Sequence, residues 1–137
     1  MTAKTKEYKP SDDEEFMNPK QQAYFKDKLQ AWRFDIQRES AETVESLQEH
    51  NLNAPDLADR ATSESDRSIE LRARDRQRKL VSKINQALKR IEDGEYGFCE
   101  ETGEPISLQR LDARPIATLS LEAQERHERR EKVYRDD

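Results

Sequence analysis

The sequence contains one cysteine, Cys99, and only three glycines among its 137 residues. A single cysteine excludes a disulfide within the chain and cannot by itself hold a structural zinc ion. The glycines, Gly94, Gly97 and Gly103, all lie close to Cys99. Because glycine adopts unusual backbone conformations at little cost, their clustering predicts a tight knuckle around the cysteine.

Apolar residues are also scarce. They make up 32% of the chain, whereas about 45–50% is typical of globular domains. Charged residues reach 40%, against a typical value of about 25%. This composition excludes a large globular core. The abundance of Glu, Arg, Lys, Gln, Leu and Ala favours long solvated helices beside a small folded region.

Long hydrophobic runs are missing as well. The sequence has no run of about 18 apolar residues and no apolar segment at its N-terminus, so we expect neither a membrane span nor a signal peptide. We expect a cytoplasmic location, with which the single cysteine agrees. The formal net charge of −5 makes general binding to nucleic acid a poor first hypothesis.

Helix signals begin at Asn18, which is followed by Pro19 and by Gln21. An N-cap residue, a proline at the first helical position and a glutamine three residues after the cap predict the start of a long helix. Its apolar positions step by four, three and four residues, the spacing of a coiled-coil seam. They are Phe25, Leu29, Trp32 and Ile36.

A second helix is predicted from about residue 62 to residue 91, after a turn over residues 51–61 that contains Pro55. Its seam is Leu80, Ile84, Ala87 and Ile91, and both seams become less apolar toward the turn. Because so short a connection joins only antiparallel neighbours, we predict an antiparallel coiled-coil hairpin over residues 18–92.

Three further segments complete a mainly α fold. Residues 1–17 are polar, and we expect a loose arm. Residues 93–119 are rich in turns, where residues 96–98 and 105–106 are expected to form two short strands. Ser107 is expected to cap a short helix that contains Leu108 and Leu111.

Residues 120–137 are predicted to form a last helix, starting near Ser120. We expect it to be solvated and to dock through Leu121 and Val133. Acidic and basic residues at i,i+4 favour ion pairs along it. These pairs are Glu122 with Arg126, Glu125 with Arg129, and Glu128 with Lys132.

Five strings of residues resemble the DksA/TraR family of bacterial RNA polymerase regulators, and the resemblance covers nearly the whole chain. They are Phe16–Asn18, Leu29–Arg33, Pro55–Thr62, Leu71–Arg76 and Arg110–Pro115. The resemblance implies a protein that inserts its hairpin into the secondary channel of RNA polymerase. Promoter choice then changes without contact to a specific DNA sequence, and a monomer is the simplest form to enter the channel.

The tip of the hairpin carries two carboxylates, Asp56 and Asp59, beside Ala61. From the residues alone, two acids in a turn most often mark the start of a helix. The resemblance aligns Asp56, Asp59 and Ala61 with tip positions that carry function in the family. We expect these acids to bias mobile polymerase elements near the active site and to destabilise short-lived open complexes.

A basic stripe on the second helix is predicted from steps of four, three and four residues. Its members are Arg72, Arg76, Lys79 and Lys83. From the residues alone, this stripe is a solvated face as readily as a binding surface. The resemblance gives Arg76 a contact with polymerase. It places Leu80, Lys83 and Arg114 where the alarmone ppGpp is bound together with polymerase, although Gln124 stands where family members have a lysine.

The resemblance also implies a four-cysteine zinc site that survives only at Cys99. Thr102, Ser120 and Ala123 stand at the other ligand positions. Threonine and serine are poor zinc ligands and alanine is none, so we expect no zinc. We expect Cys99 to be a packed, inert thiol whose ionisation Glu100 and Glu101 oppose.

Other function classes stay open on the residues alone. An enzyme is the weakest of them, because His50 and His127 are far apart in the chain and no phosphate loop or nucleophile motif occurs. A helical adaptor would bind a partner through the flanks of the seam. A transcript-cleavage factor would enter the same polymerase channel with acids at the end of a rod.

Overall fold

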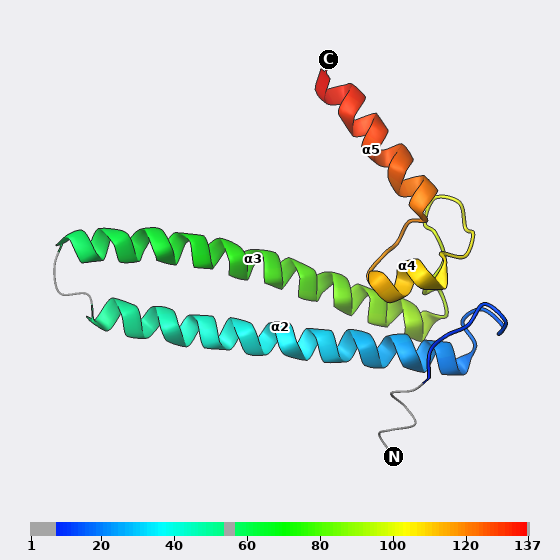
Figure 1. Ribbon diagram of the computed structural model, residues 1–137, viewed down its shortest axis with the longest axis horizontal. Coiled ribbons are helices and arrows are strands. Elements are labelled where there is room, and N and C mark those ends of the chain that lie inside the picture. Colours follow the sequence, from blue (N-terminus) through cyan, green and yellow to red (C-terminus); the bar gives the residue numbers. More distant parts are fainter. Residues whose placement is uncertain (1–7, 54–56, 137) are drawn as a thin grey trace. The chain divides into compact units, whose positions relative to one another are not determined.

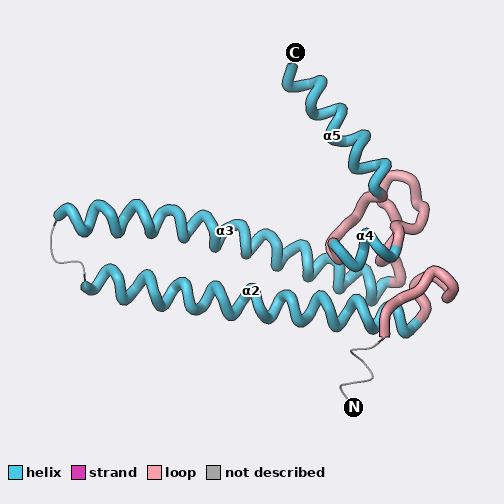
Figure 2. The backbone as a smooth tube through the Cα atoms, viewed as in Figure 1, coloured by secondary structure: helices cyan, strands magenta, loops and turns pink. Residues whose placement is uncertain are grey.

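The computed structural model describes residues 8–53 and 57–136. Within these residues, four helices follow one another: α2 (Pro19–Asn53), α3 (Leu57–Asp93), α4 (Leu108–Ala113) and α5 (Leu121–Asp136) (Figures 1 and 2). The only β-pairing in this part of the chain is an isolated bridge between Phe98 and Pro105. The mainly α fold predicted from the sequence is confirmed.

Two compact units divide the chain. One comprises Met1–Leu29 with Gln86–Asp137, and the other comprises Gln30–Asn85. The second unit is an antiparallel hairpin of α2 and α3. Among the residues that the structure describes, no helix combines the length and apolar character needed to cross a membrane.

The start of α2 has the predicted cap. Oδ1 of Asn18 accepts the backbone N–H of Gln21 at 2.9 Å. The side chain of Gln21 in turn accepts the N–H of Met17 at 2.7 Å. This reciprocal pair satisfies the N–H of Gln21, which a helix start leaves free, and the N–H of Met17 just before the cap.

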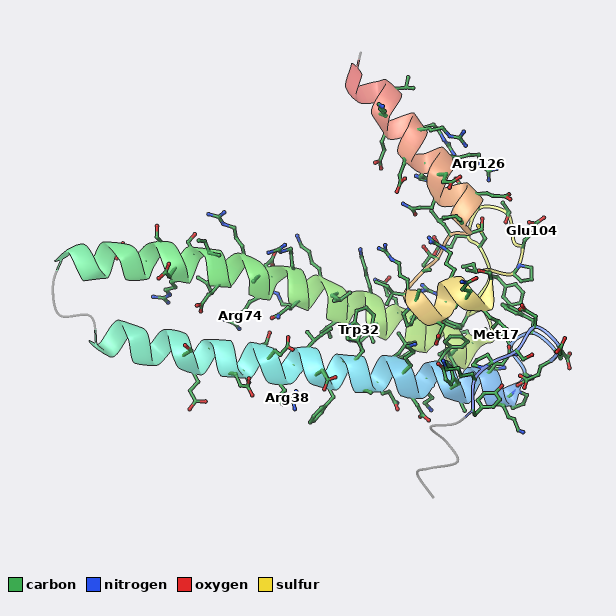
Figure 3. The ribbon with its side chains drawn as sticks, viewed as in Figure 1. Met17, Trp32, Arg38, Arg74, Glu104 and Arg126 are labelled. Atoms are coloured by element: carbon green, nitrogen blue, oxygen red, sulfur yellow. The ribbon has the colours of Figure 1, made fainter. Side chains whose placement is uncertain are left out.

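The seam predicted for the hairpin is also confirmed. In the second unit, Ile36 and Ile84 are buried, and Trp32 and Leu80 are half-buried. The seam continues in the first unit, where Phe25, Leu29, Ala87 and Ile91 are buried. The charged side chain of Arg38 lies outside the seam and points away from α3 (Figure 3). Toward the turn the packing weakens, and the side chain of Ile69 is 61% exposed there.

The turn is shorter than predicted. Helix α2 reaches Asn53 and α3 already begins at Leu57, so the expected start at residue 62 was wrong. Residues 57–61 contain no glycine or proline, and leucine, alanine and arginine are strong helix formers. Pro55 carried too much weight in the prediction, since it precedes the first residue of α3 and does not prevent the residues that follow it from forming a helix.

Residues 8–17 differ from the loose arm that we expected, and residues 1–7 lie outside the described range. The Tyr8 hydroxyl donates to Glu14 at 2.7 Å. The ring of Phe16 packs edge-on against Phe98, with centroids 5.4 Å apart. A Cβ atom on Gly97 would lie 3.1 Å from Phe16. The arm therefore packs against the knuckle segment of its own unit.

The core of the first unit gathers residues from α2, α3 and the segment after α3. Beside the four seam residues of this unit, its buried apolar side chains include Tyr96, Ile106, Leu108, Leu111 and Ile116. The Tyr96 hydroxyl donates to the carbonyl of Pro115 at 2.7 Å. Aromatic and branched side chains thus supply the packing that holds this small region together.

Helix α4 begins as predicted, because the Ser107 hydroxyl accepts the N–H of Arg110. The two short strands are reduced to the single bridge. Two hydrogen bonds flank this bridge. The N–H of Cys99 donates to the carbonyl of Glu104 at 2.8 Å, and the N–H of Ile106 donates to the carbonyl of Gly97 at 2.7 Å. Tight turns at both ends leave no length for a ladder.

Helix α5 starts after Ser120, as predicted, but its expected docking residues were wrong. Leu121 is 59% exposed and Val133 is 60% exposed. The buried residue is Ala123, whose N–H donates to the Ser120 hydroxyl at 3.2 Å. A small side chain permits close approach, whereas the two larger ones project into solvent.

Candidate functional site

The hairpin tip lies at the limit of the described structure. Asp56 is outside the described residues. Asp59 and Ala61 belong to the first turns of α3, while their side chains lie outside the part that the structure describes. The role of these three residues therefore remains a prediction.

The basic stripe lies on α3 within the second unit, and its members Arg72, Arg76, Lys79 and Lys83 are exposed. Two of them have partners on the same helix. Arg72 donates to the Ser68 hydroxyl at 3.3 Å, and Lys79 pairs with Asp75 at 3.2 Å. Arg76 and Lys83 form no ion pair within the described part of the chain, so both charges are available to a partner.

Asp75 neutralises part of this face. Its carboxylate accepts from Arg78 at 2.6 Å and from Lys79 at 3.2 Å. These hydrogen bonds, first that of Arg78, lower the pKa of Asp75. The exposed positive charge of α3 therefore concentrates at residues that Asp75 does not reach, which include Arg76.

The three residues expected at the ppGpp site fall in different units. Leu80 is half-buried and Lys83 is exposed, both on α3 in the second unit. Arg114 is exposed in the first unit, where its N–H caps α4 by donating to the carbonyl of Arg110 at 2.8 Å. Gln124 lies on α5 and donates to Glu128 at 3.2 Å.

The segment that presents Arg114 is anchored by Asp112. Its Oδ1 accepts from the Tyr24 hydroxyl at 2.5 Å and from Nζ of Lys28 at 2.7 Å. The hydrogen bonds from Lys28 and Tyr24 lower the pKa of Asp112. Burial, followed by the bond to Asp112, raises the pKa of Tyr24 to about 12. Sequence reasoning missed this cluster, because residues 84 and 88 positions apart share no spacing signal.

The knuckle retains its backbone frame around Cys99, which is 2% exposed. The N–H of Gly103 donates to the Cys99 carbonyl at 2.8 Å. The N–H of Glu100 donates to the Thr118 carbonyl at 2.8 Å. All three glycines have positive φ, as a tight knuckle requires. The sequence therefore predicted this turn correctly.

The thiol of Cys99 is packed, as expected, but its ionisation is favoured rather than opposed. Burial raises its pKa. Hydrogen bonds from the Thr102 hydroxyl and from the backbone N–H groups of Ser120, Thr102 and Glu101 outweigh burial and lower the pKa to about 6. The expectation that Glu100 and Glu101 would oppose ionisation of the thiol was wrong, because hydrogen-bond donors point at the sulfur and stabilise its negative charge.

The donors at the knuckle do not fit a zinc ion. One thiolate, two hydroxyls and the methyl group of Ala123 stand at the four positions, and hydroxyl groups are weak zinc ligands at neutral pH. Across residues 8–53 and 57–136, no group of three or more His, Cys, Asp or Glu side chains is arranged to hold a metal. In this region the Cys99 thiol accepts hydrogen bonds, and the side chain of Ala123 is buried.

Glu101 joins the knuckle to α5. Its carboxylate lies 3.2 Å from Arg130, 3.2 Å from Nε2 of His127 and 3.7 Å from Arg126. Arg126 thus pairs with Glu101 rather than with Glu122, the partner that the i,i+4 spacing predicted. A bend in the chain brings Glu101 within reach, which spacing along one helix could not reveal.

Comparison with known families agrees with this arrangement. A family model described as the N-terminal domain of the DnaK suppressor protein DksA matches residues 21–91. A second, described as the prokaryotic dksA/traR C4-type zinc finger, matches residues 94–129. The chain belongs to the DksA family. The match to the second family model covers a knuckle that has one of its four cysteines in this chain.

Similar members of the DksA family come from several bacteria. A relative from Caulobacter vibrioides (strain NA1000 / CB15N) is 68% identical over 131 residues, 96% of this chain and 92% of its own length. One from Escherichia coli (strain K12) is 44% identical over 125 residues, 91% and 83% of the two chains. Both are named RNA polymerase-binding transcription factor DksA.

A solved structure supports the fold of the DksA family for this chain. The structure of transcription factor DksA2 from Pseudomonas aeruginosa has a TM-score of 0.80 at 43% identity. It covers 85% of this chain and 90% of its own. The resemblance noted in the sequence and the coiled-coil fold class are thereby confirmed.

Proposed function

We propose that this protein binds bacterial RNA polymerase and regulates transcription through its hairpin. The tip enters the secondary channel and destabilises short-lived open complexes at promoters such as those of ribosomal RNA. The observation that carries the proposal is the 68% identity, over 96% of the chain, to a relative named as an RNA polymerase-binding transcription factor. Polymerase as the partner implies action in the cytoplasm.

The surface of α3 around Arg76 and the tip of the hairpin have separate roles in this proposal. Arg76 is exposed and has no ion pair among the described residues, which supports a contact with polymerase. Asp56, Asp59 and Ala61 form the active tip by their match to the family. The acids are assigned to mobile elements of polymerase rather than to the catalytic magnesium, because two carboxylates without fixed geometry bind a divalent cation weakly.

The alarmone ppGpp is the proposed effector. Lys83 and Arg114 supply an ammonium and a guanidinium, the donors that a polyphosphate binds best, and Leu80 supplies an apolar contact. Both cations are exposed. Because Gln124 is neutral where family members have a lysine, we expect weaker synergy with ppGpp than in those relatives.

The regulator is proposed to act without zinc and as a monomer. The four knuckle positions offer one thiolate, and its charge is stabilised by hydrogen bonds from Thr102 and from backbone N–H groups. This proposal predicts that treating the purified protein with a chelator, and removing the chelator before the transcription assay, leaves both helicity and regulation unchanged. One equivalent of bound zinc, with loss of fold on chelation, would refute it.

Transcription from a ribosomal RNA promoter with purified polymerase tests the function. Wild type should repress, more strongly with ppGpp, and Asp59→Asn should bind polymerase but lose repression. Lys83→Ala combined with Arg114→Ala should keep repression and lose the synergy. No repression by folded wild type would favour the helical adaptor, and cleavage of a backtracked transcript would indicate a cleavage factor.

A further inference from the structure

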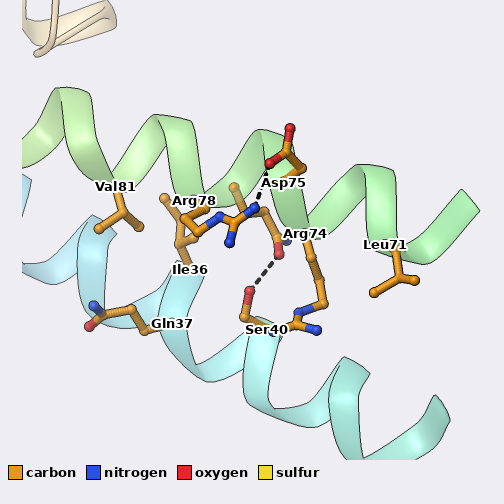
Figure 4. A pocket seen from close by; sticks show the side chains of 9 residues that line it. Ile36, Gln37, Ser40, Leu71, Arg74, Asp75, Arg78 and Val81 are labelled. Atoms are coloured by element: carbon orange, nitrogen blue, oxygen red, sulfur yellow. Dashed lines mark hydrogen bonds and ion pairs between the residues drawn. The ribbon is translucent and has the colours of Figure 1, made fainter. Parts of the chain in front are cut away.

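A polar pair interrupts the seam of the hairpin in the second unit. The Ser40 hydroxyl on α2 donates to Oε1 of Gln77 on α3 at 2.8 Å (Figure 4). Both side chains are half-buried. Gln77 precedes Leu80 and Ile84 in the seam of α3, so the pair stands where a coiled coil ordinarily has apolar contacts.

Apolar packing is thin around this pair. Gln77 lines a groove of about 320 Å³ together with the apolar side chains of Ile36, Leu71 and Val81. It also lines a second groove of about 440 Å³. Glu70 lines this second groove. Its Oε2 atom is buried without a hydrogen-bond partner in the described structure. A hydrogen bond, rather than interlocking side chains, therefore connects the two helices here.

A second cross-helix hydrogen bond shows the register. Nη1 of Arg33 donates to Oδ1 of Asn85 at 2.7 Å. Seven residues separate Arg33 from Ser40 on α2, and eight separate Gln77 from Asn85 on α3. The two bonds therefore belong to one antiparallel alignment, about 10–12 Å apart along the helix axis.

Hydrogen bonds and apolar contacts constrain this alignment differently. Apolar contact is non-directional, so by itself it constrains the axial alignment of two helices less than a hydrogen bond does. A hydrogen bond between one particular pair of side chains is lost after a slip of one helical turn, about 5.4 Å. A polar pair in a coiled-coil seam thus fixes register at some cost in stability.

We propose that Ser40 and Gln77 form a register lock, which fixes the axial position and rotation of α3 against α2. Arg76 is adjacent to Gln77, so the lock also determines the direction in which Arg76 projects from the hairpin. Ser40 and Gln77 are positioning residues for the polymerase contact. The last step rests on the proposed function, whereas the lock itself does not.

Electron paramagnetic distance measurement tests the lock in the full chain. Nitroxide labels replace the exposed Arg38 and Lys79 in a Cys99→Ser background. The parent should give one narrow distance distribution. Gln77→Leu, which makes the seam more apolar, should keep or raise the midpoint of thermal unfolding, yet broaden the distribution or displace it by about 5 Å.

Two further variants complete the experiment. The exchange Ser40→Gln with Gln77→Ser restores a hydrogen bond and should restore the narrow distribution. Gln37→Leu alters an exposed residue of the same groove that makes no hydrogen bond in the described structure, and should change nothing. If Gln77→Leu and Ser40→Ala both keep the parent distribution, the lock is refuted.

Transcription assays on the same substitutions, made in the unlabelled wild-type chain, test the positioning role. Gln77→Leu should repress less than wild type, and the exchanged pair should recover repression. Repression unchanged in a variant whose register has moved would refute the positioning role. If even unlabelled wild type fails to repress, the proposed function fails, while the distance distributions still decide the lock.

Discussion

Cys99 shows how much a single residue depends on backbone that surrounds it. The thiol is buried, which disfavours a thiolate, yet several hydrogen-bond donors converge on its sulfur and lower the pKa to about 6. Only one of these donors is a side chain, that of Thr102. The residue that replaces a ligand cysteine thus stabilises the negative charge that zinc would otherwise stabilise.

Thr102→Val should raise the pKa of Cys99 toward its ordinary value, because valine has the shape of threonine without the donor. The absorbance of the thiolate near 240 nm, followed against pH, measures this shift. Ser120→Ala is the matched control, since the backbone N–H of residue 120 remains. An unchanged titration curve in Thr102→Val would show that the hydroxyl does not act on the sulfur.

The same pKa has a consequence for stability. The folded value of about 6 lies below the value of about 8.5 for an unfolded cysteine. The thiolate therefore contributes fully to the free energy of unfolding above about pH 8.5. This contribution is lost as the pH falls through the folded pKa. Subtracting the pH profile of Cys99→Ser isolates it.

At the scale of elements, the N-terminal arm and the knuckle form one packed assembly in their unit. Met17 has a φ of 53°, which turns the chain into α2 after Phe16 has reached Phe98. Gly97 makes this approach possible, because Phe16 and Met17 occupy the space of its missing side chain. Apolar contact thus supports a knuckle that the donor set cannot support with metal.

Gly97→Ala should therefore destabilise the protein more than Gly103→Ala. Both glycines have positive φ, 93° and 75°, and alanine there costs about 1–2 kcal/mol. Only at Gly97 would the new Cβ meet side chains, at 3.1–3.3 Å. We expect an additional loss of about 1 kcal/mol in the free energy of unfolding. Urea denaturation followed by circular dichroism measures both variants, and equal losses would contradict packing of the arm.

Sequence patterns predicted the elements better than their contacts. The periodicity of Phe25, Leu29 and Ile36 encodes a seam directly, since every helix buries residues by the same geometry. The docking of α5 had no such signal, because Ala123 is small and its burial depends on a neighbouring loop. Sequence patterns also misplaced the helix ends near Pro55, because the helix propensity of the neighbouring residues outweighed the effect of the proline.

Whole-molecule charge explains how an acidic protein presents a basic surface. The net charge is −5, yet residues 64–85 contain seven basic and four acidic side chains, and residues 30–46 contain two basic and four acidic ones. The two arms of the hairpin thus carry opposite charge. The basic arm suits a protein partner with acidic patches, while the overall charge opposes nonspecific binding to DNA.

Arg76→Ala should weaken binding to RNA polymerase, with a dissociation constant about tenfold higher, or about 1.4 kcal/mol. The effect should diminish at high salt, because an exposed charge is screened. Arg38→Ala removes the same charge from α2, where Arg38 lies 3.9 Å from Asp35, and should leave binding unchanged. Fluorescence anisotropy of the labelled protein, titrated with polymerase at two salt concentrations, measures both variants. Equal weakening by the two substitutions would mean that net charge, rather than the α3 surface, determines the affinity.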